Sequence, residues 1–303
     1  MDLTLAMILL FQMIVGILGN FSLMIHQTVL HFFGCNSRPT DLILRHLVVA
    51  NALAILSKGV PQIMLALGLT HHLNDVGCNL FLYFERVARG VSIFTTCLLS
   101  VFQVITISPL HSRWAGLKLK ALKYVGPSSI LCWILHMLVN AIFPVYVSSK
   151  WTNTTAIIIK KNVFKYCSKH YDNVTCSLYV ALIYSHDVLC LGFMSLASGS
   201  MVFILCRHKQ RVQHIYNNNM TSKCSVETRA TESILTLEII YASSYTFSTM
   251  AYSYLPLTGS SAQWLMSTSA FILMFFPTVS PFVRISSDSR VSRFFAVCYS
   301  SNT

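Results

Sequence analysis

The chain has 303 residues, of which 54% are hydrophobic and only 11% are charged. Soluble domains carry about 25% charged residues, so this composition excludes an ordinary water-soluble globule, and its hydrophobicity excludes a disordered chain. The formal net charge is +12. Because the basic residues lie between long apolar runs rather than on one soluble basic face, this charge indicates membrane topology and not nucleic-acid binding.

Seven apolar runs follow one another along the chain, and each has the length of about 20 residues that a membrane-spanning helix needs. Helices are expected because lipid cannot satisfy the open edge of a sheet. The predicted spans are residues 5–25, 42–69, 80–107, 122–147, 178–206, 234–257 and 264–285. The sequence therefore predicts an all-α membrane protein, with one seven-transmembrane helix bundle over residues 1–303 and a short cytoplasmic tail at 286–303. The first run lacks a basic region before it and a small-residue cleavage site after it, so we expect it to remain as a helix.

Lys and Arg are distributed unevenly between the two sets of connecting segments. With the N-terminus outside, the inner segments hold thirteen Lys or Arg residues, whereas the outer segments hold five, all between residues 150 and 169. The positive-inside rule then predicts an extracellular N-terminus and a cytoplasmic C-terminus. The sequons at Asn153 and Asn173 fall in the same outer segment, where we expect glycosylation.

The ten cysteines include no Cys-x-x-Cys pair, so the sequence does not predict a structural zinc site. Cys78 stands at the outer end of the third run, and Cys167 and Cys176 lie in the outer segment, which is an oxidising location. We expect a disulfide bond between Cys78 and one of these two residues. Cys167 is our preferred partner, although sequence alone does not determine the pairing.

Ionisable side chains within the apolar runs are costly in lipid and are expected to face the bundle interior. Polar residues of the third run recur at helical spacing and form one stripe, with the ionisable members toward its outer end. Stripes on the second, fifth and sixth runs are expected to converge with it. The candidate ligand contacts are Lys58, Glu85, Arg86, Arg89, Asp187 and Tyr252.

Two interpretations of these stripes stay open. The charged residues could form internal ion pairs that only hold helices together, or they could line an outward-opening pocket for a small ligand. Asn20 and Asn51 lie deeper in their runs, and we expect them to form hydrogen bonds between helices.

Catalytic motifs are missing from the sequence. His186-Asp187 is the one His-Asp neighbour, no serine is placed as a nucleophile, and the common hydrolase, metalloprotease and phosphate-binding motifs do not occur. We therefore expect no enzyme activity, no metal and no cofactor. A transporter would show broken helices and a polar path through both leaflets. The charges here gather toward the outer side of the third run, which favours a pocket closed at its inner end.

Eight segments spread over nearly the whole chain carry a family resemblance. In order, they are RPTDLILRHL (38–47), LSKGVPQ (56–62), NDVGC (74–78), RVARGVS (86–92), TTCLLSVFQ (95–103), HKQRVQH (208–214), ETRAT (227–231) and FPTVSPF (276–282). Together they are similar to the vomeronasal type-1 receptors, a family of seven-helix G-protein-coupled receptors for pheromone-like small molecules.

The resemblance implies a G-protein-coupled-receptor-like bundle at the plasma membrane that senses a small pheromone-like molecule and signals through a heterotrimeric G protein of the inhibitory type. It also implies a glycan on the outer loop and a bond from Cys78 to that loop. Lys209, Arg211 and Arg229 flank the inner loop between the fifth and sixth runs, and we expect them to face the G protein. A bitter-taste-type receptor is the nearest alternative, and a small-molecule transporter is a more distant one.

Two motifs of the larger rhodopsin-like group are replaced in this sequence. Ile105-Thr106-Ile107 stands where Asp-Arg-Tyr is usual, and Ser280-Pro281-Phe282-Val283 stands where Asn-Pro-x-x-Tyr is usual. The activation switches of that group therefore do not carry over, and neither does any ligand-contact residue.

Overall fold

The computed structural model describes residues 3–32, 39–69, 75–107, 115–149, 173–215, 226–254 and 263–287, and each of these ranges contains one helix. The helices are α1 (Leu3–Phe32), α2 (Pro39–Ala66), α3 (Asp75–Ile107), α4 (Ala115–Ser149), α5 (Asn173–Ile215), α6 (Val226–Tyr254) and α7 (Gln263–Ser287). No strand occurs within the described ranges. The predicted all-α, seven-helix fold is therefore confirmed.

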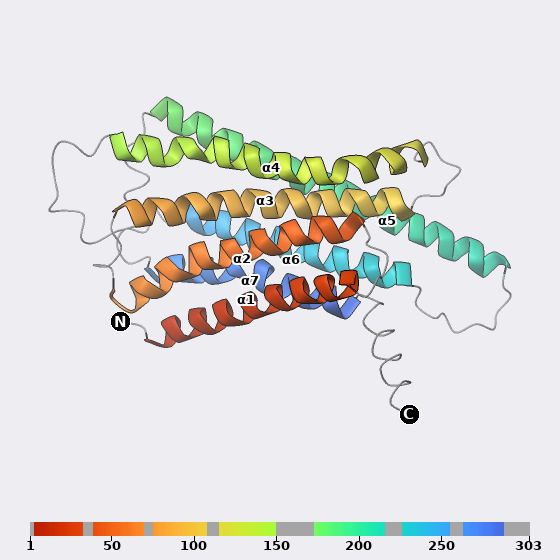
Figure 1. Ribbon diagram of the computed structural model, residues 1–303, viewed down its shortest axis with the longest axis horizontal. Coiled ribbons are helices and arrows are strands. Elements are labelled where there is room, and N and C mark those ends of the chain that lie inside the picture. The colour runs from red at the N-terminus through yellow and green to blue at the C-terminus, as the bar shows by residue number, and fades with distance from the viewer. Residues whose placement is uncertain are drawn as a thin grey trace.

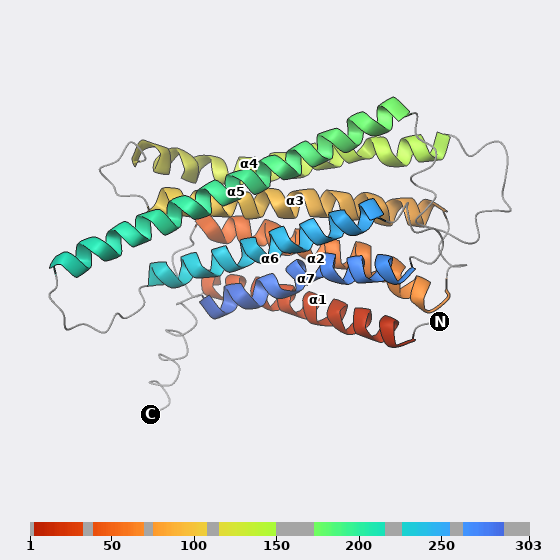
Figure 2. The same ribbon diagram turned by 180° about the vertical axis from the view of Figure 1, so that it is seen from behind.

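The helices lie side by side in one elongated bundle, and successive helices run in opposite directions (Figure 1). Helix α3 is central and contacts α2, α4, α5 and α6, whereas α1 packs only on α2 and α7 among its main neighbours. Figure 2 shows the opposite face, where α5, α6 and α7 lie in front of α2 and α3. The helices α4 and α5 extend beyond the apolar runs predicted for them, since the helical backbone continues into the polar residues at their ends.

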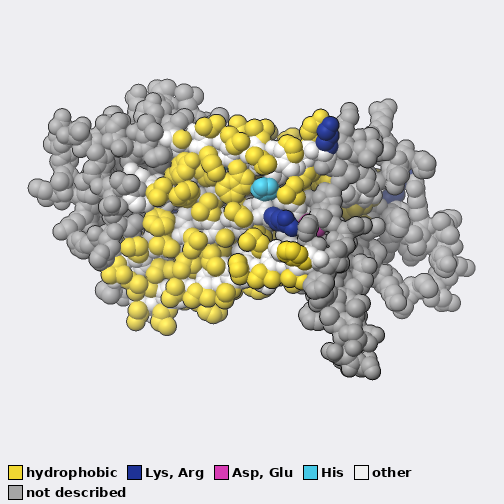
Figure 3. Space-filling view, in the orientation of Figure 1, with side chains coloured by type: hydrophobic (Ala, Val, Ile, Leu, Met, Phe, Trp, Pro, Cys, Tyr) yellow, Lys and Arg dark blue, Asp and Glu magenta, His cyan; other side chains and the backbone are white. Residues whose placement is uncertain are grey.

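The outer surface of the bundle is apolar. Large hydrophobic side chains such as Phe11 on α1, Leu138 on α4 and Leu196 on α5 are 64–70% exposed. Figure 3 shows hydrophobic side chains covering most of the described part of one face, in a band across the middle of the bundle. A continuous apolar surface of this size is unstable in water. It is the surface that a membrane-spanning bundle presents to lipid.

Helix α6 is more polar than its neighbours. Six helices in the described part of the chain are long and apolar enough to cross a membrane, and α6 is not one of them. It carries Glu238 and many hydroxyl-bearing side chains, which lower its hydropathy. Its polar residues Tyr241, Ser244 and Ser248 are buried, and its apolar Ile239 is 68% exposed. The sixth predicted run is therefore a helix whose polar face turns toward the interior.

Buried asparagines link the inner helices. The side-chain amide of Asn20 on α1 donates a hydrogen bond of 2.9 Å to the carbonyl oxygen of Pro277 on α7. Asn51 on α2 donates to Ser280 Oγ on α7 and accepts from Ser92 Oγ on α3, both at 2.9 Å. The predicted interhelical role of Asn20 and Asn51 is confirmed. Hydrogen bonds of this kind are worth about 0.6–2 kcal/mol each in membrane proteins.

A glycine allows α1 to approach α2 and α7 closely. A Cβ atom built on Gly16 would lie 2.7 Å from Ile55 Cδ1 and 2.8 Å from Thr278 Oγ1. Ile55 is fully buried, so it has little room to move aside. The absence of a side chain at position 16 is therefore a packing requirement of the α1–α2–α7 contact.

Replacing Gly16 with Leu is expected to destabilise the bundle by about 1–3 kcal/mol, because the new side chain would overpack this contact. Gly199→Leu is the matched control, since position 199 is exposed on α5 and a Cβ atom there meets nothing within 4 Å. Leucine raises helix propensity by about the same amount at both positions. Thermal unfolding of the purified protein in detergent measures the difference, and equal melting temperatures for the two variants would contradict the packing argument.

Candidate functional site

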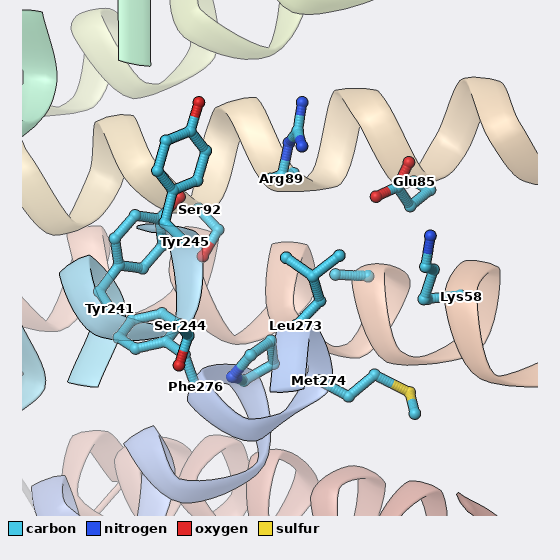
Figure 4. Close-up of a pocket in the computed structure, with 12 residues that line it drawn as sticks. Lys58, Glu85, Arg89, Ser92, Tyr241, Ser244, Tyr245, Leu273, Met274 and Phe276 are labelled. Atoms are coloured by element: carbon cyan, nitrogen blue, oxygen red, sulfur yellow. The ribbon is translucent and has the colours of Figure 1, made fainter. Parts of the chain in front are cut away.

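A cavity of about 40 Å³ lies between α2, α3, α6 and α7, which is room for a few water molecules. Its residues combine charged, hydroxyl-bearing and apolar side chains (Figure 4). They are Ala54, Lys58, Glu85, Arg89, Ser92, Tyr241, Ser244, Tyr245, Leu273, Met274, Phe276 and Pro277. A ligand larger than a few atoms would have to displace some of these side chains, and those of Lys58 and Met274 have enough rotatable bonds to move.

The charged end of the cavity is formed by α2 and α3. Lys58 is 5% exposed, and its side chain points toward Glu85 (Figure 4). The carboxylate of Glu85 interacts electrostatically with Lys58, Arg89 and Arg86. An isolated charge at this depth would be costly, because lipid and protein solvate it poorly. Opposite charges on adjacent helices offset that cost only while the helices keep this orientation.

Asp187 on α5 connects three helices. It is 2% exposed; its Oδ2 accepts a hydrogen bond of 2.7 Å from the hydroxyl of Tyr245 on α6, and its Oδ1 lies 3.1 Å from Nδ1 of His186. Arg89 of α3 interacts electrostatically with both Asp187 and Glu85. Figure 4 shows the side chains of Arg89 and Tyr245 pointing in the same direction. Asp187 thus holds two cavity residues in place.

The structure brings together half of the predicted ligand contacts. Lys58, Glu85 and Arg89 line the cavity, whereas Asp187 lies behind Tyr245 and Arg86 lies beside Glu85 without lining the cavity. Tyr252 is in the last turn of α6, and its side chain is outside the described part of the structure.

The other predicted site residues lie at the ends of helices or in connecting segments. Asn153 and Cys167 fall outside the described residues. The remaining ones occupy described helices, but their side chains are not described; they are Cys78 on α3, Asn173, Lys209 and Arg211 on α5, and Arg229 on α6. The predicted disulfide bond, glycans and G-protein contacts therefore stay predictions.

Sequence reasoning missed the apolar wall that α7 contributes. Leu273, Met274 and Phe276 line the cavity, but nothing distinguishes them from other apolar residues of the seventh run. Tyr241 and Tyr245 belong to the predicted stripe on the sixth run, and the structure places both at the cavity. The helical period predicted which face of the sixth run carries these tyrosines, but it did not predict which turn of that face lies at the cavity.

Two buried polar atoms one turn from the cavity have no hydrogen-bond partner among the described residues: Gln62 Oε1 on α2 and Ser248 Oγ on α6. Gln62 follows Lys58 by four residues, and Ser248 follows Tyr245 by three, so each lies on the same helical face as a cavity residue. An unpaired buried polar atom is costly and calls for an explanation. Both atoms are suited to contact a ligand that extends beyond the cavity.

Another buried carboxylate lies one turn from Tyr241 on α6. Glu238 is 8% exposed and accepts a hydrogen bond from the hydroxyl of Ser198 on α5. The nearby Ser195 also interacts with this carboxylate. The α5–α6 contact therefore holds two reciprocal pairs: a carboxylate of α5 with a hydroxyl of α6, and a carboxylate of α6 with a hydroxyl of α5.

A seven-helix bundle with an apolar outer surface, interhelical hydrogen bonds and a charged interior cavity defines a multi-pass membrane protein of the seven-helix receptor class. The model of the vomeronasal organ pheromone receptor family, type 1, matches residues 3–297. The chain belongs to this family, and it is therefore a G-protein-coupled pheromone receptor, as the sequence resemblance implied.

Curated relatives agree with this assignment over almost the whole chain. Human vomeronasal type-1 receptor 2 is 53% identical over 95% of this chain and 73% of its own length. Human vomeronasal type-1 receptor 4 is 51% identical over 94% of this chain and 95% of its own length. Human vomeronasal type-1 receptor 3 is 47% identical over 99% of this chain and 96% of its own length.

The Ser198–Glu238 hydrogen bond gives a prediction for stability. Ser198→Ala is expected to destabilise the receptor by about 1–3 kcal/mol, because it leaves a buried carboxylate short of a donor. In a Glu238→Leu background the same substitution should cost less than about 0.5 kcal/mol, because the carboxylate is gone.

Ser200→Ala is the matched control for this cycle, since Ser200 is exposed on the same helix and donates to the carbonyl oxygen of Leu196 within α5. Thermal unfolding in detergent provides the measurement. If Ser198→Ala costs the same with and without Glu238, the two side chains are not energetically coupled.

Proposed function

We propose that this receptor binds a small molecule from the extracellular side in the cavity between α2, α3, α6 and α7, and that binding activates a heterotrimeric G protein of the inhibitory type. The observation that carries the proposal is the position of the charged cavity within the bundle. Glu85 and Arg89 lie in the first half of α3, and Lys58 lies in the second half of α2. With an extracellular N-terminus, both positions fall in the outer half.

The charge distribution of the sequence supports this orientation at the plasma membrane, because the Lys- and Arg-rich connections then face the cytoplasm. Large aromatic side chains line the cavity at the end away from Lys58 and Glu85 (Figure 4). Tyr241 and Phe276 pack edge to face with ring centroids 4.8 Å apart, and both belong to the buried cluster below the charged residues. Buried aromatic packing at this end of the cavity favours a binding site over a path through the membrane.

Ligand binding would act on α6 through Tyr245. In the present arrangement the Tyr245 hydroxyl is bound to Asp187 on α5. A ligand that competes for Tyr245 or for Arg89 weakens this connection and favours a different position of α6. Only a ligand that binds the rearranged state better than the resting one shifts the population, and about 5.5 kcal/mol of difference moves a receptor from mostly inactive to mostly active.

The inner ends of α5 and α6 are the proposed contact for the G protein. Lys209 and Arg211 are in the last turns of α5, and Arg229 is in the first turn of α6. A basic surface at the membrane favours association with an acidic protein surface and also attracts anionic lipid. Movement of α6 relative to α5 would change the spacing of these charges.

Arg89→Gln tests the pocket. It is expected to raise the half-maximal concentration of agonists by about tenfold or more, the equivalent of about 1.4 kcal/mol, because the cation lines the cavity. Arg86→Gln is the matched control on the same helix, since Arg86 does not line the cavity. The readout is G-protein activation at matched surface expression, for agonists found by screening volatile and semi-volatile small molecules. Equal potency in both variants and the unmodified receptor would contradict the pocket assignment.

Lys209→Gln combined with Arg211→Gln tests the coupling surface. The double substitution is expected to reduce the maximal G-protein response severalfold. Agonist potency should change much less, because the charges that it removes lie far from the cavity. Arg45→Gln, on α2, serves as a comparison for loss of a basic side chain elsewhere. The same assay with inhibitory and stimulatory G proteins supplied separately identifies the partner. An unchanged maximal response would argue against this surface, and a response through the stimulatory protein alone would argue against inhibitory coupling.

A further inference from the structure

One turn of α5 carries a thiol, an imidazole and a carboxylate in contact with one another. Cys190 Sγ lies 3.6 Å from Nε2 of His186, and Nδ1 of the same ring lies 3.1 Å from Oδ1 of Asp187. The imidazole therefore stands between the thiol and the carboxylate and contacts each through a different ring nitrogen. The sequence motif His186-Asp187 did not indicate this cluster, because the thiol lies one helical turn further along.

The arrangement is the one that activates a cysteine nucleophile. A carboxylate bound to Nδ1 orients the imidazole and stabilises its protonated form, while Nε2 takes the thiol proton. Cys190 packs among apolar side chains, but its Sγ also contacts the imidazole of His186. Within the described residues, no group of three His, Cys, Asp or Glu side chains is placed to hold a metal ion.

The thiol lies directly behind the cavity wall. Cys190 is 6% exposed and packs in one buried cluster with Tyr241 and Phe276, against which Tyr245 also packs. Those three aromatic residues line the cavity. Tyr241 and Tyr245 are stacked with ring centroids 6.3 Å apart, and Tyr245 is held by Asp187. Access from the cavity to Cys190 would require the Tyr245 side chain to rotate away from Asp187.

We propose that Cys190 is a covalent capture site for small α,β-unsaturated carbonyl compounds that enter the cavity. In the step, Cys190 Sγ forms a bond to the β-carbon, and the electrons of the carbon–carbon double bond move toward the carbonyl to give an enolate. The proton that the thiol gave to His186 is then delivered to the α-carbon. The product is a thioether; nothing leaves, and no redox partner is needed. Capture is a property of the thiol cluster and does not depend on the proposed G-protein coupling.

The test uses the full-length receptor in membrane vesicles, treated with trans-2-hexenal or with hexanal, which lacks the double bond. After mild reduction, peptide mass mapping measures adducts at each cysteine over time. The expected result is a hexenal adduct on Cys190 and no thioether with hexanal. Cys206, which is exposed on the same helix, supplies an internal reference for the dose of reagent.

Variants assign the role of each residue. Cys190→Ser should abolish the adduct at this position and leave labelling of Cys206 unchanged. His186→Gln should slow labelling of Cys190 by about tenfold or more, which is the lower range of acid–base assistance, again without affecting Cys206. Cys97→Ser removes the neighbouring thiol but keeps the imidazole, so Cys190 should still be labelled faster than in His186→Gln. Melting temperatures of the variants in detergent identify any that fail to fold.

Three results would overturn the proposal. The first is hexenal labelling that occurs at Cys206 but not at Cys190 in the folded, unmodified receptor. The second is a labelling rate at Cys190 that is the same in a folded His186→Gln variant as in the unmodified protein, since the thiol would then react without the imidazole. An adduct at Cys97 in place of Cys190 would also reject the assignment. None of these outcomes bears on whether Arg89 contacts an agonist.

Discussion

The arrangement of this bundle depends on the compensation of charge in a medium that solvates charge poorly. Lys58, Glu85, Arg89 and Asp187 supply two positive and two negative groups on α2, α3 and α5. Rotation of any one of these helices about its axis would turn a charge toward lipid, at a cost of several kcal/mol. The mutual attraction therefore constrains helix orientation, which apolar packing against lipid specifies weakly. The same four groups account for a polar cavity inside an otherwise apolar protein.

Buried charge is also compensated at the contact between α5 and α6, but there the partners of the carboxylates are neutral hydroxyl groups. Each helix presents one buried carboxylate, and each carboxylate accepts a hydrogen bond from a hydroxyl of the other helix. Helix α6 packs more extensively on α7 than on α5, so these polar contacts contribute much of what holds the two helices together. A ligand that alters one of them changes the position of α6 more readily than it could by disturbing a tightly packed apolar interface.

Much of this fold could be predicted from sequence, because hydropathy and helical period report on the bilayer directly. The seven helices, the inward faces of the polar stripes and the roles of Asn20 and Asn51 all follow from spacing along one chain. The residues that the sequence could not identify depend on how helices are rotated against each other. Leu273 and Met274 look like any apolar residues until α7 is placed against α2 and α3. Asp187 was predicted from its polar stripe, but its partner Tyr245 is 58 positions away in sequence and is identified only by the fold.

The polarity of α6 has a consequence for how the protein is made. Each span leaves the translocon for lipid according to its own apolarity, and a helix with Glu238 and a row of tyrosines partitions poorly by itself. Its retention in the bilayer thus depends on α5, which is synthesised first and already offers Ser198 and Asp187 as partners, and on α7, which arrives next. Substitutions on α5 that face α6 should therefore appear as defects of biogenesis in the endoplasmic reticulum, in receptors whose odorant contacts are intact.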